Sequence, residues 1–125
     1  MIVGLGIDIA EVDRIERAIR RYGQRFLQRV FTPAEIDYCQ SKANVFERFA
    51  GRFAAKEAAM KAIGTGWKRG VKWRDFEVVR EPSGRPVIRF SGVAAGFAEH
   101  LGMKRALVSI THTSAQAIAQ VILEQ

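Results

Sequence analysis

The sequence is poor in cysteine, since Cys39 is the only one among 125 residues. A single thiol cannot pair within the chain, which excludes a small domain held together by disulfides. No apolar run approaches the roughly 20 residues that a membrane span needs, and there are no repeats, low-complexity tracts or linkers rich in proline, glycine or serine. With 48% apolar and 26% charged residues, intrinsic disorder is excluded as the main state.

The N-terminal segment does not show the pattern expected of a secretory leader. The first nine residues are apolar but are interrupted by Asp8, and they contain neither a basic start nor a small-residue cleavage site. Together with the single cysteine, this predicts a reducing, cytoplasmic setting without membrane insertion. The length is typical of one domain, so we expect residues 1–125 to fold as a single unit.

Acidic residues are outnumbered by basic ones, 13 against 20, which gives a net charge of +7. This excess favours an anionic partner: a nucleic acid, a phosphorylated small molecule, an acidic protein or a membrane surface. Helical spacing places Arg14, Arg17 and Arg21 on one face of a predicted helix. Such a face is either solvated or a docking surface for an acidic partner.

Hydrophobic periodicity predicts an α+β domain. Short apolar runs predict strands at residues 2–9, 76–80, 86–90 and 106–111, with a hairpin turn at 82–85. Apolar residues at helical spacing predict helices at residues 11–22, 33–42, 45–63 and 93–101. Two of these helices have clear starts, a Thr32-Pro33 pair followed by Glu35 for one and Asn44 for the longest. Residues 115–123 fit either a helix or a strand.

Two carboxylates are the first candidates for chemistry. Asp8 ends the first strand and Glu57 lies midway along the longest helix. Asp8 could be a plain loop or cap residue, and Glu57 could simply pair with Lys61 four residues later. Alanines around Glu57 make the helix surface low enough for a ligand to approach, and Lys56 and Lys61 bring positive charge. Carboxylates beside lysines suit a Mg²⁺ ion that carries phosphates.

Two polar segments are further candidates. Gly64, Thr65 and Gly66 follow the longest helix, where they either end it or let a ligand approach the backbone, but they lack the spacing of a P-loop. Near the C-terminus, strand alternation places Ser109 and Thr111 on one face and His112 on the other. A histidine in a strand is more often structural than functional.

In combination, these segments resemble the bacterial holo-[acyl-carrier-protein] synthases, the small 4′-phosphopantetheinyl transferases. The matching segments are Gly4–Ile9, Gly51–Gly66 and Ser109–Thr113, which occur in this order and span most of the chain. The resemblance implies the 4′-phosphopantetheinyl transferase fold: an antiparallel sheet packed with a long central helix, in a trimer with active sites between subunits. It also implies that residues 116–124 form a final strand.

The resemblance implies a reaction as well. The family moves 4′-phosphopantetheine from coenzyme A to a serine of apo acyl carrier protein, releases adenosine 3′,5′-bisphosphate and supports fatty acid biosynthesis. By resemblance, Asp8 and Glu57 hold Mg²⁺, Glu57 is the candidate base for the serine proton, and Lys61 binds the pyrophosphate and stabilises developing charge.

The remaining assignments by resemblance concern binding. Coenzyme A is expected to contact Lys61 and a further set of residues: Arg52, Gly64, Thr65, Ser109, Thr111 and His112. The acidic carrier protein is expected to dock on Arg14, Arg21 and Arg25. The alternative to this transferase is a basic nucleic-acid-binding module without catalysis, which the arginines favour but which leaves Asp8 and Glu57 without a role.

Overall fold

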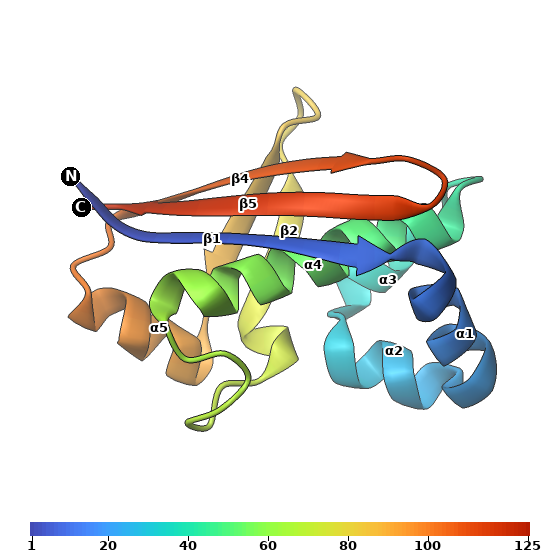
Figure 1. Cartoon of the computed structure of the whole chain (residues 1–125), viewed down its shortest axis with the longest axis horizontal. Coiled ribbons are helices and arrows are strands. Elements are labelled where there is room, and N and C mark those ends of the chain that lie inside the picture. The colour runs from blue at the N-terminus through green and yellow to red at the C-terminus, as the bar shows by residue number, and fades with distance from the viewer.

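A three-stranded antiparallel sheet lies across one side of a long helix, as Figure 1 shows. This computed structural model describes residues 1–125. In the sheet, β5 (Gln116–Glu124) lies between β1 (Ile2–Glu11) and β4 (Arg105–His112), and the helix beneath it is α4 (Val45–Ile63). The predicted α+β class and the long central helix are therefore confirmed.

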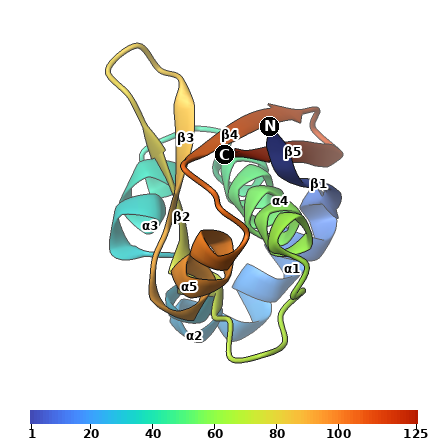
Figure 2. The same ribbon diagram turned by 90° about the vertical axis from the view of Figure 1, so that its left-hand side faces the viewer.

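The remaining elements are shorter and surround α4. They are α1 (Val12–Tyr22), α2 (Gln24–Val30), α3 (Pro33–Gln40), the 3₁₀ turn η1 (Trp73–Asp75), β2 (Phe76–Arg80), β3 (Pro86–Phe90) and α5 (Gly92–His100). Figure 2 shows the β2–β3 hairpin beside α4, with α1 and α2 on the side of α4 opposite the sheet. None of the helices combines the length and the apolar character that a membrane crossing requires.

Small residues let β1 and α4 pack backbone against backbone. A Cβ atom at Gly6 would lie 2.8 Å from the carbonyl carbon of Ala58 and 2.9 Å from the nitrogen of Ala62. Ala54 and Ala58 are fully buried in this contact. The alanines near Glu57 were predicted to leave room for a ligand on the helix. The structure shows that β1 of the sheet packs against them instead, so this prediction is wrong.

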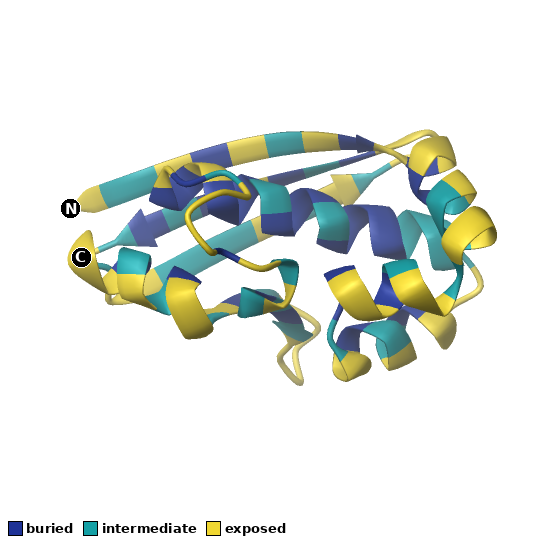
Figure 3. Ribbon diagram, turned by 90° about the horizontal axis from the view of Figure 1, so that it is seen from below, coloured by how far each residue is buried: buried dark blue, intermediate teal, exposed yellow.

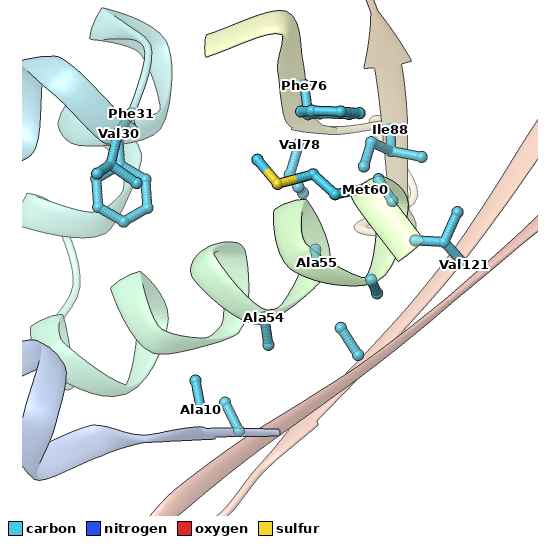
Figure 4. Close-up of a cluster of buried hydrophobic side chains, with 14 of the residues drawn as sticks. Ala10, Val30, Phe31, Ala54, Ala55, Met60, Phe76, Val78, Ile88 and Val121 are labelled. Atoms are coloured by element: carbon cyan, nitrogen blue, oxygen red, sulfur yellow. The ribbon is translucent and has the colours of Figure 1, made fainter. Parts of the chain in front are cut away.

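The core lies between α4 and the elements around it. Figure 4 shows Met60 reaching from α4 toward Phe76, Val78 and Ile88 of the hairpin. Cys39 of α3 is also fully buried, and burial raises the pKa of its thiol to about 12. The single cysteine is thus a core residue.

A buried ion pair ties α3, α4 and β2 together. Lys56 Nζ lies 2.7 Å from Glu35 Oε1 with both side chains inaccessible, and it also donates to the carbonyl oxygen of Phe76. Glu35 accepts from the backbone N–H of Thr32 at 2.9 Å and of Val78 at 2.8 Å, so the predicted helix start is confirmed as a capping box. The prediction that Lys56 adds charge beside Glu57 is wrong, because Lys56 points into the core.

Two short elements, α2 and η1, were not predicted. The segment whose local pattern fitted either a helix or a strand is the strand β5. The structure agrees here with the strand that the resemblance implied for residues 116–124. Asn44 precedes α4 but its side chain caps no helix N–H; it donates to Glu47 and accepts from Arg48 instead.

Candidate active site

Three predicted site residues come together where β1 crosses α4. Asp8 lies on β1, and Glu57 and Lys61 lie one turn apart on α4. Lys61 Nζ donates to Asp8 Oδ1 at 2.9 Å and to the carbonyl oxygen of Ile7 at 3.0 Å. Lys61 therefore pairs with a residue 53 positions away in the sequence and not with Glu57, the simpler partner that helical spacing offered.

Glu57 has an unusual affinity for a proton. Burial raises the pKa of its carboxyl from 4.5 to about 7, and the neighbouring carboxylate of Asp8 adds to the shift. The positive charges of Lys61 and Arg14 act in the opposite direction. Without a cation at the site, Glu57 can thus take up or release a proton close to neutral pH, which suits a general base.

Asp8 has an unused acceptor that fits a bound cation. Its side chain is 10% exposed, and Oδ2 is buried without a hydrogen-bond partner. A buried carboxylate oxygen without a donor is costly, and a second carboxylate beside it adds repulsion. No three histidine, cysteine, aspartate or glutamate side chains cluster as a metal site. Two carboxylates match Mg²⁺, which takes one or two from protein and fills its shell with phosphate oxygens and water.

Arg52 and His112 line a different, basic cavity of about 150 Å³. Arg52 is 2% exposed, its Nε has no hydrogen-bond partner, and its guanidinium lies 4.1 Å from the ring centre of Tyr38. Burial lowers the pKa of this guanidinium. His112 Nδ1 lies 3.1 Å from Glu47 Oε2. An anion would satisfy the unpartnered guanidinium.

Two further cations of this cavity were not predicted, Arg48 and Arg80. Arg48 lies four residues before Arg52 on α4, so helical spacing alone could have paired them. Arg80 comes from the end of β2, and no signal in the sequence connects it with α4. This cavity shares no lining residue with the surface at Asp8 and Lys61.

The other predicted coenzyme contacts are scattered. Ser109 and Thr111 are exposed on the outer face of the sheet, in register with Gln120 and Ile118 of β5. Thr65 is buried and its hydroxyl donates to the Gly66 carbonyl oxygen at 2.8 Å. Gly64 ends α4 in the left-handed conformation with φ 80°. Within one chain, these residues do not form a single site with Asp8.

The predicted docking arginines lie on the surface. Arg14 and Arg21 are exposed on α1, and Arg25 is exposed on α2. Arg14 lies close enough to Glu57 to lower its pKa. The basic face is thus continuous with the carboxylate site.

Comparisons with known proteins agree on one family. Residues 4–121 match the model of the 4′-phosphopantetheinyl transferase superfamily. The chain is 60% identical over 124 residues to a holo-[acyl-carrier-protein] synthase of Solibacter usitatus, with 99% of each chain covered. It also resembles the crystal structure of such a synthase from Neisseria meningitidis (TM-score 0.88, 34% identity, 100% of both chains). A synthase of Helicobacter pylori solved with coenzyme A matches at TM-score 0.84 and 32% identity, over 96% of this chain and 99% of the other.

Proposed function

This chain belongs to the 4′-phosphopantetheinyl transferase superfamily, and from that premise we propose which of its residues carry the reaction. It is an enzyme with holo-[acyl-carrier-protein] synthase activity. It transfers 4′-phosphopantetheine from coenzyme A to a serine of apo acyl carrier protein, releases adenosine 3′,5′-bisphosphate and supports fatty acid biosynthesis. The observation that supports the residue roles best is the meeting of Asp8, Glu57 and Lys61 where β1 crosses α4.

Asp8 and Glu57 are the residues that hold Mg²⁺ in this proposal. The unpartnered Oδ2 of Asp8 and the adjacent carboxylate of Glu57 supply the oxygen ligands that this ion prefers. When bound, Mg²⁺ offsets negative charge on the pyrophosphate of coenzyme A.

Glu57 takes the proton from the attacking serine. A serine hydroxyl is a weak nucleophile without an acceptor for its proton, and the Glu57 carboxylate beside Asp8 is that acceptor in this proposal. Lys61 binds the pyrophosphate, because its side chain is 55% exposed beside Asp8 and its ammonium group can turn toward a phosphate. Its positive charge stabilises the charge that develops as the phosphate bond breaks.

The nucleotide end of coenzyme A occupies the basic cavity beside the N-terminal half of α4. Arg48, Arg52, Arg80 and His112 line it, and the buried guanidinium of Arg52 lacks a partner that a phosphate would supply. Ser109, Thr111, Gly64 and Thr65 are further coenzyme contacts in this proposal, through side-chain hydroxyls on β4 and through backbone at the end of α4. The phosphates and the pantetheine then extend toward Asp8.

The two parts of this site come from neighbouring subunits of a trimer. The cavity at Arg52 and the surface at Asp8 share no lining residue. The outer face of β1 exposes Leu5, Ile7 and Ile9, each more than half accessible, in register with β5. An apolar sheet face of this kind is a surface that another subunit covers. A substitution Ile7→Glu is expected to yield monomers in light scattering and to abolish transfer.

The carrier protein docks on the exposed arginines of α1 and α2, namely Arg14, Arg21 and Arg25. Their charges attract an acidic partner, and Arg14 lies near Glu57, where the serine must arrive. Reversing these charges should mainly raise the KM for the carrier protein.

Intact-mass spectrometry of an apo acyl carrier protein tests the proposed function directly. The carrier is incubated with this enzyme, coenzyme A and Mg²⁺, and a second sample contains a chelator. A chelator-sensitive gain of one phosphopantetheine on the serine supports the reaction and the metal. Transfer that persists in the chelator would refute the role of Mg²⁺.

A further inference from the structure

The loop after α4 exposes a tryptophan. Trp67 lies in the segment Gly64–Lys72 and is 69% accessible, more than any other tryptophan, tyrosine or phenylalanine of the chain. The loop is turned toward the same side as α1 and α2, where Figure 3 shows it largely exposed. A tryptophan exposed to this degree is a frequent anchor of protein interfaces, because it buries a large, rigid surface with little loss of entropy.

Trp67 is part of a groove of about 320 Å³ between this loop and α2. We call it the Trp67 groove, and its lining residues are Gln28, Arg29, Trp67, Val71, Lys72, Trp73 and Arg74. A second hollow of about 320 Å³, with Tyr22, Arg25 and Phe26 in its wall, adjoins it through the shared residue Arg29. The groove therefore continues the arginine surface of α1 and α2.

The charge of the Trp67 groove is of one sign. Arg29, Lys72 and Arg74 line it, and Lys68 and Arg69 are exposed in the same loop. None of these five cations lies within 4.0 Å of a carboxylate oxygen. The adjacent acid, Asp75, is occupied by the backbone N–H groups of Lys72 and Ala94. The charge therefore suits an occupant with acidic side chains.

The groove lies beside the face of α4 that carries Glu57. The ring of Trp73 stacks on the ring of Phe53 with centroids 4.9 Å apart. Phe53, Glu57 and Lys61 are spaced by four residues, so they follow one another along a single face of the helix. A protein that presents a serine to Glu57 covers this face, and the Trp67 groove and the α1 arginines lie within its reach.

We propose that the Trp67 groove is a second contact surface for the carrier protein, which binds there through an acidic segment that carries an apolar side chain. The apolar side chain packs on Trp67, and the acidic ones face Arg29, Lys72 and Arg74. This inference rests on the proposed function, since it assumes that a carrier protein is the acceptor. The nucleotide of coenzyme A is assigned to a separate cavity at Arg52, and the proposed coenzyme contacts of this loop, Gly64 and Thr65, do not line the groove.

The test compares Michaelis constants for the two substrates in three variants of the full-length enzyme. Trp67→Ala is expected to raise the KM for apo carrier protein roughly tenfold or more, and Arg74→Glu several-fold with a shallower response to salt, because one attractive charge is lost. Both should leave the KM for coenzyme A and kcat unchanged. Lys104→Glu is the matched control, because Lys104 is an exposed cation remote from the groove in sequence, and its KM values should equal those of the wild type.

Other results would overturn the inference. If Trp67→Ala raised the KM for coenzyme A and left that of the carrier unchanged, the groove would be a coenzyme site. If both constants matched the wild type, the groove would be no substrate surface. Because Trp67 and Arg74 are exposed, their substitution does not threaten the core.

Direct binding separates this inference from the proposed function. The emission of Trp67, measured in a Trp73→Phe variant, should change and saturate when an apo carrier protein that lacks tryptophan is added. A saturating change without any transfer would refute the proposed reaction and support the groove. Transfer by the wild type without an emission change would refute the groove and leave the reaction standing.

Discussion

Gly6 of β1 lies against the backbone of Ala58 in α4 so closely that no side chain fits between them. A Cβ atom at Gly6 would come within 3 Å of three backbone atoms of α4, including the Ala62 nitrogen. This contact sets the distance between strand and helix, and both carboxylates are close to it, because Asp8 is two residues from Gly6 on β1 and Glu57 is next to Ala58 on α4. The spacing of the proposed metal ligands thus depends on the absence of a side chain at Gly6.

The substitution Gly6→Ala is therefore expected to destabilise the fold by about 1–3 kcal/mol or more and to lower activity by moving Asp8. Urea denaturation measures the first effect and the transfer assay the second. The control is Gly96→Ala in α5, where a Cβ meets nothing within 4 Å. The free energy of unfolding of that variant should rise by about 0.4–1 kcal/mol. Equal effects of the two substitutions would contradict the packing role of Gly6.

The second prediction concerns the two carboxylates. Asp8→Asn and Glu57→Gln should each lower kcat by roughly a hundredfold or more, because each removes a proposed ligand and Glu57 also accepts the serine proton. Circular dichroism should show an unchanged fold. Asp13→Asn on α1 is the control, since Asp13 is exposed and should be neutral. A fully active Glu57→Gln enzyme would remove Glu57 from both roles.

The third prediction is a pH dependence in the metal-free protein. Because the pKa of Glu57 is about 7 in the folded state and near 4.5 when unfolded, the folded state binds more protons between these values. The free energy of unfolding should therefore decrease as the pH rises from about 4.5 to about 7. Urea titrations in the presence of a chelator measure it, and Glu57→Gln should flatten this part of the curve. The charged groups that act on Glu57 are Asp8, Lys61 and Arg14.

The fourth prediction concerns the buried pair of Lys56 and Glu35. Lys56→Met leaves the Glu35 carboxylate buried without its cation, so the free energy of unfolding should fall by about 3–5 kcal/mol. The double substitution with Glu35→Gln should recover part of this loss, because the unpaired charge is removed. Urea denaturation of both variants measures the difference. If the double variant were less stable than Lys56→Met alone, the backbone N–H donors of Glu35 would be sufficient to stabilise its carboxylate without Lys56.

Local signals in the sequence predicted the regular elements well. The hairpin turn between β2 and β3 and the boundaries of both strands followed from Pro82–Arg85 and the flanking apolar runs. The end of α4 followed from Gly64, which adopts the conformation that glycine favours. α2 was missed because seven residues without a side-chain cap carry too little local signal.

Contacts between distant residues were beyond the sequence. The periodicity of residues 115–123 was ambiguous because β5 owes its state to pairing with β1 and β4 on both sides. The carboxylate pair was predicted, but Lys56 was given the wrong side of α4. Lys56 and Lys61 are five residues apart on α4, so they point in different directions, and only the presence of Glu35 in the core decides which of them is buried.

Because the only cysteine is buried, its chemical labelling can report local opening of the fold around α3. Cys39 has no accessible surface and a thiol pKa of about 12, so an alkylating reagent at about pH 8 finds almost no thiolate in the closed molecule. Labelling of Cys39 then requires α3 to separate from α4. The labelling rate of the wild-type enzyme would therefore measure how often α3 and α4 separate. If coenzyme A binds Arg52, which lies near Cys39, bound coenzyme A should lower this labelling rate.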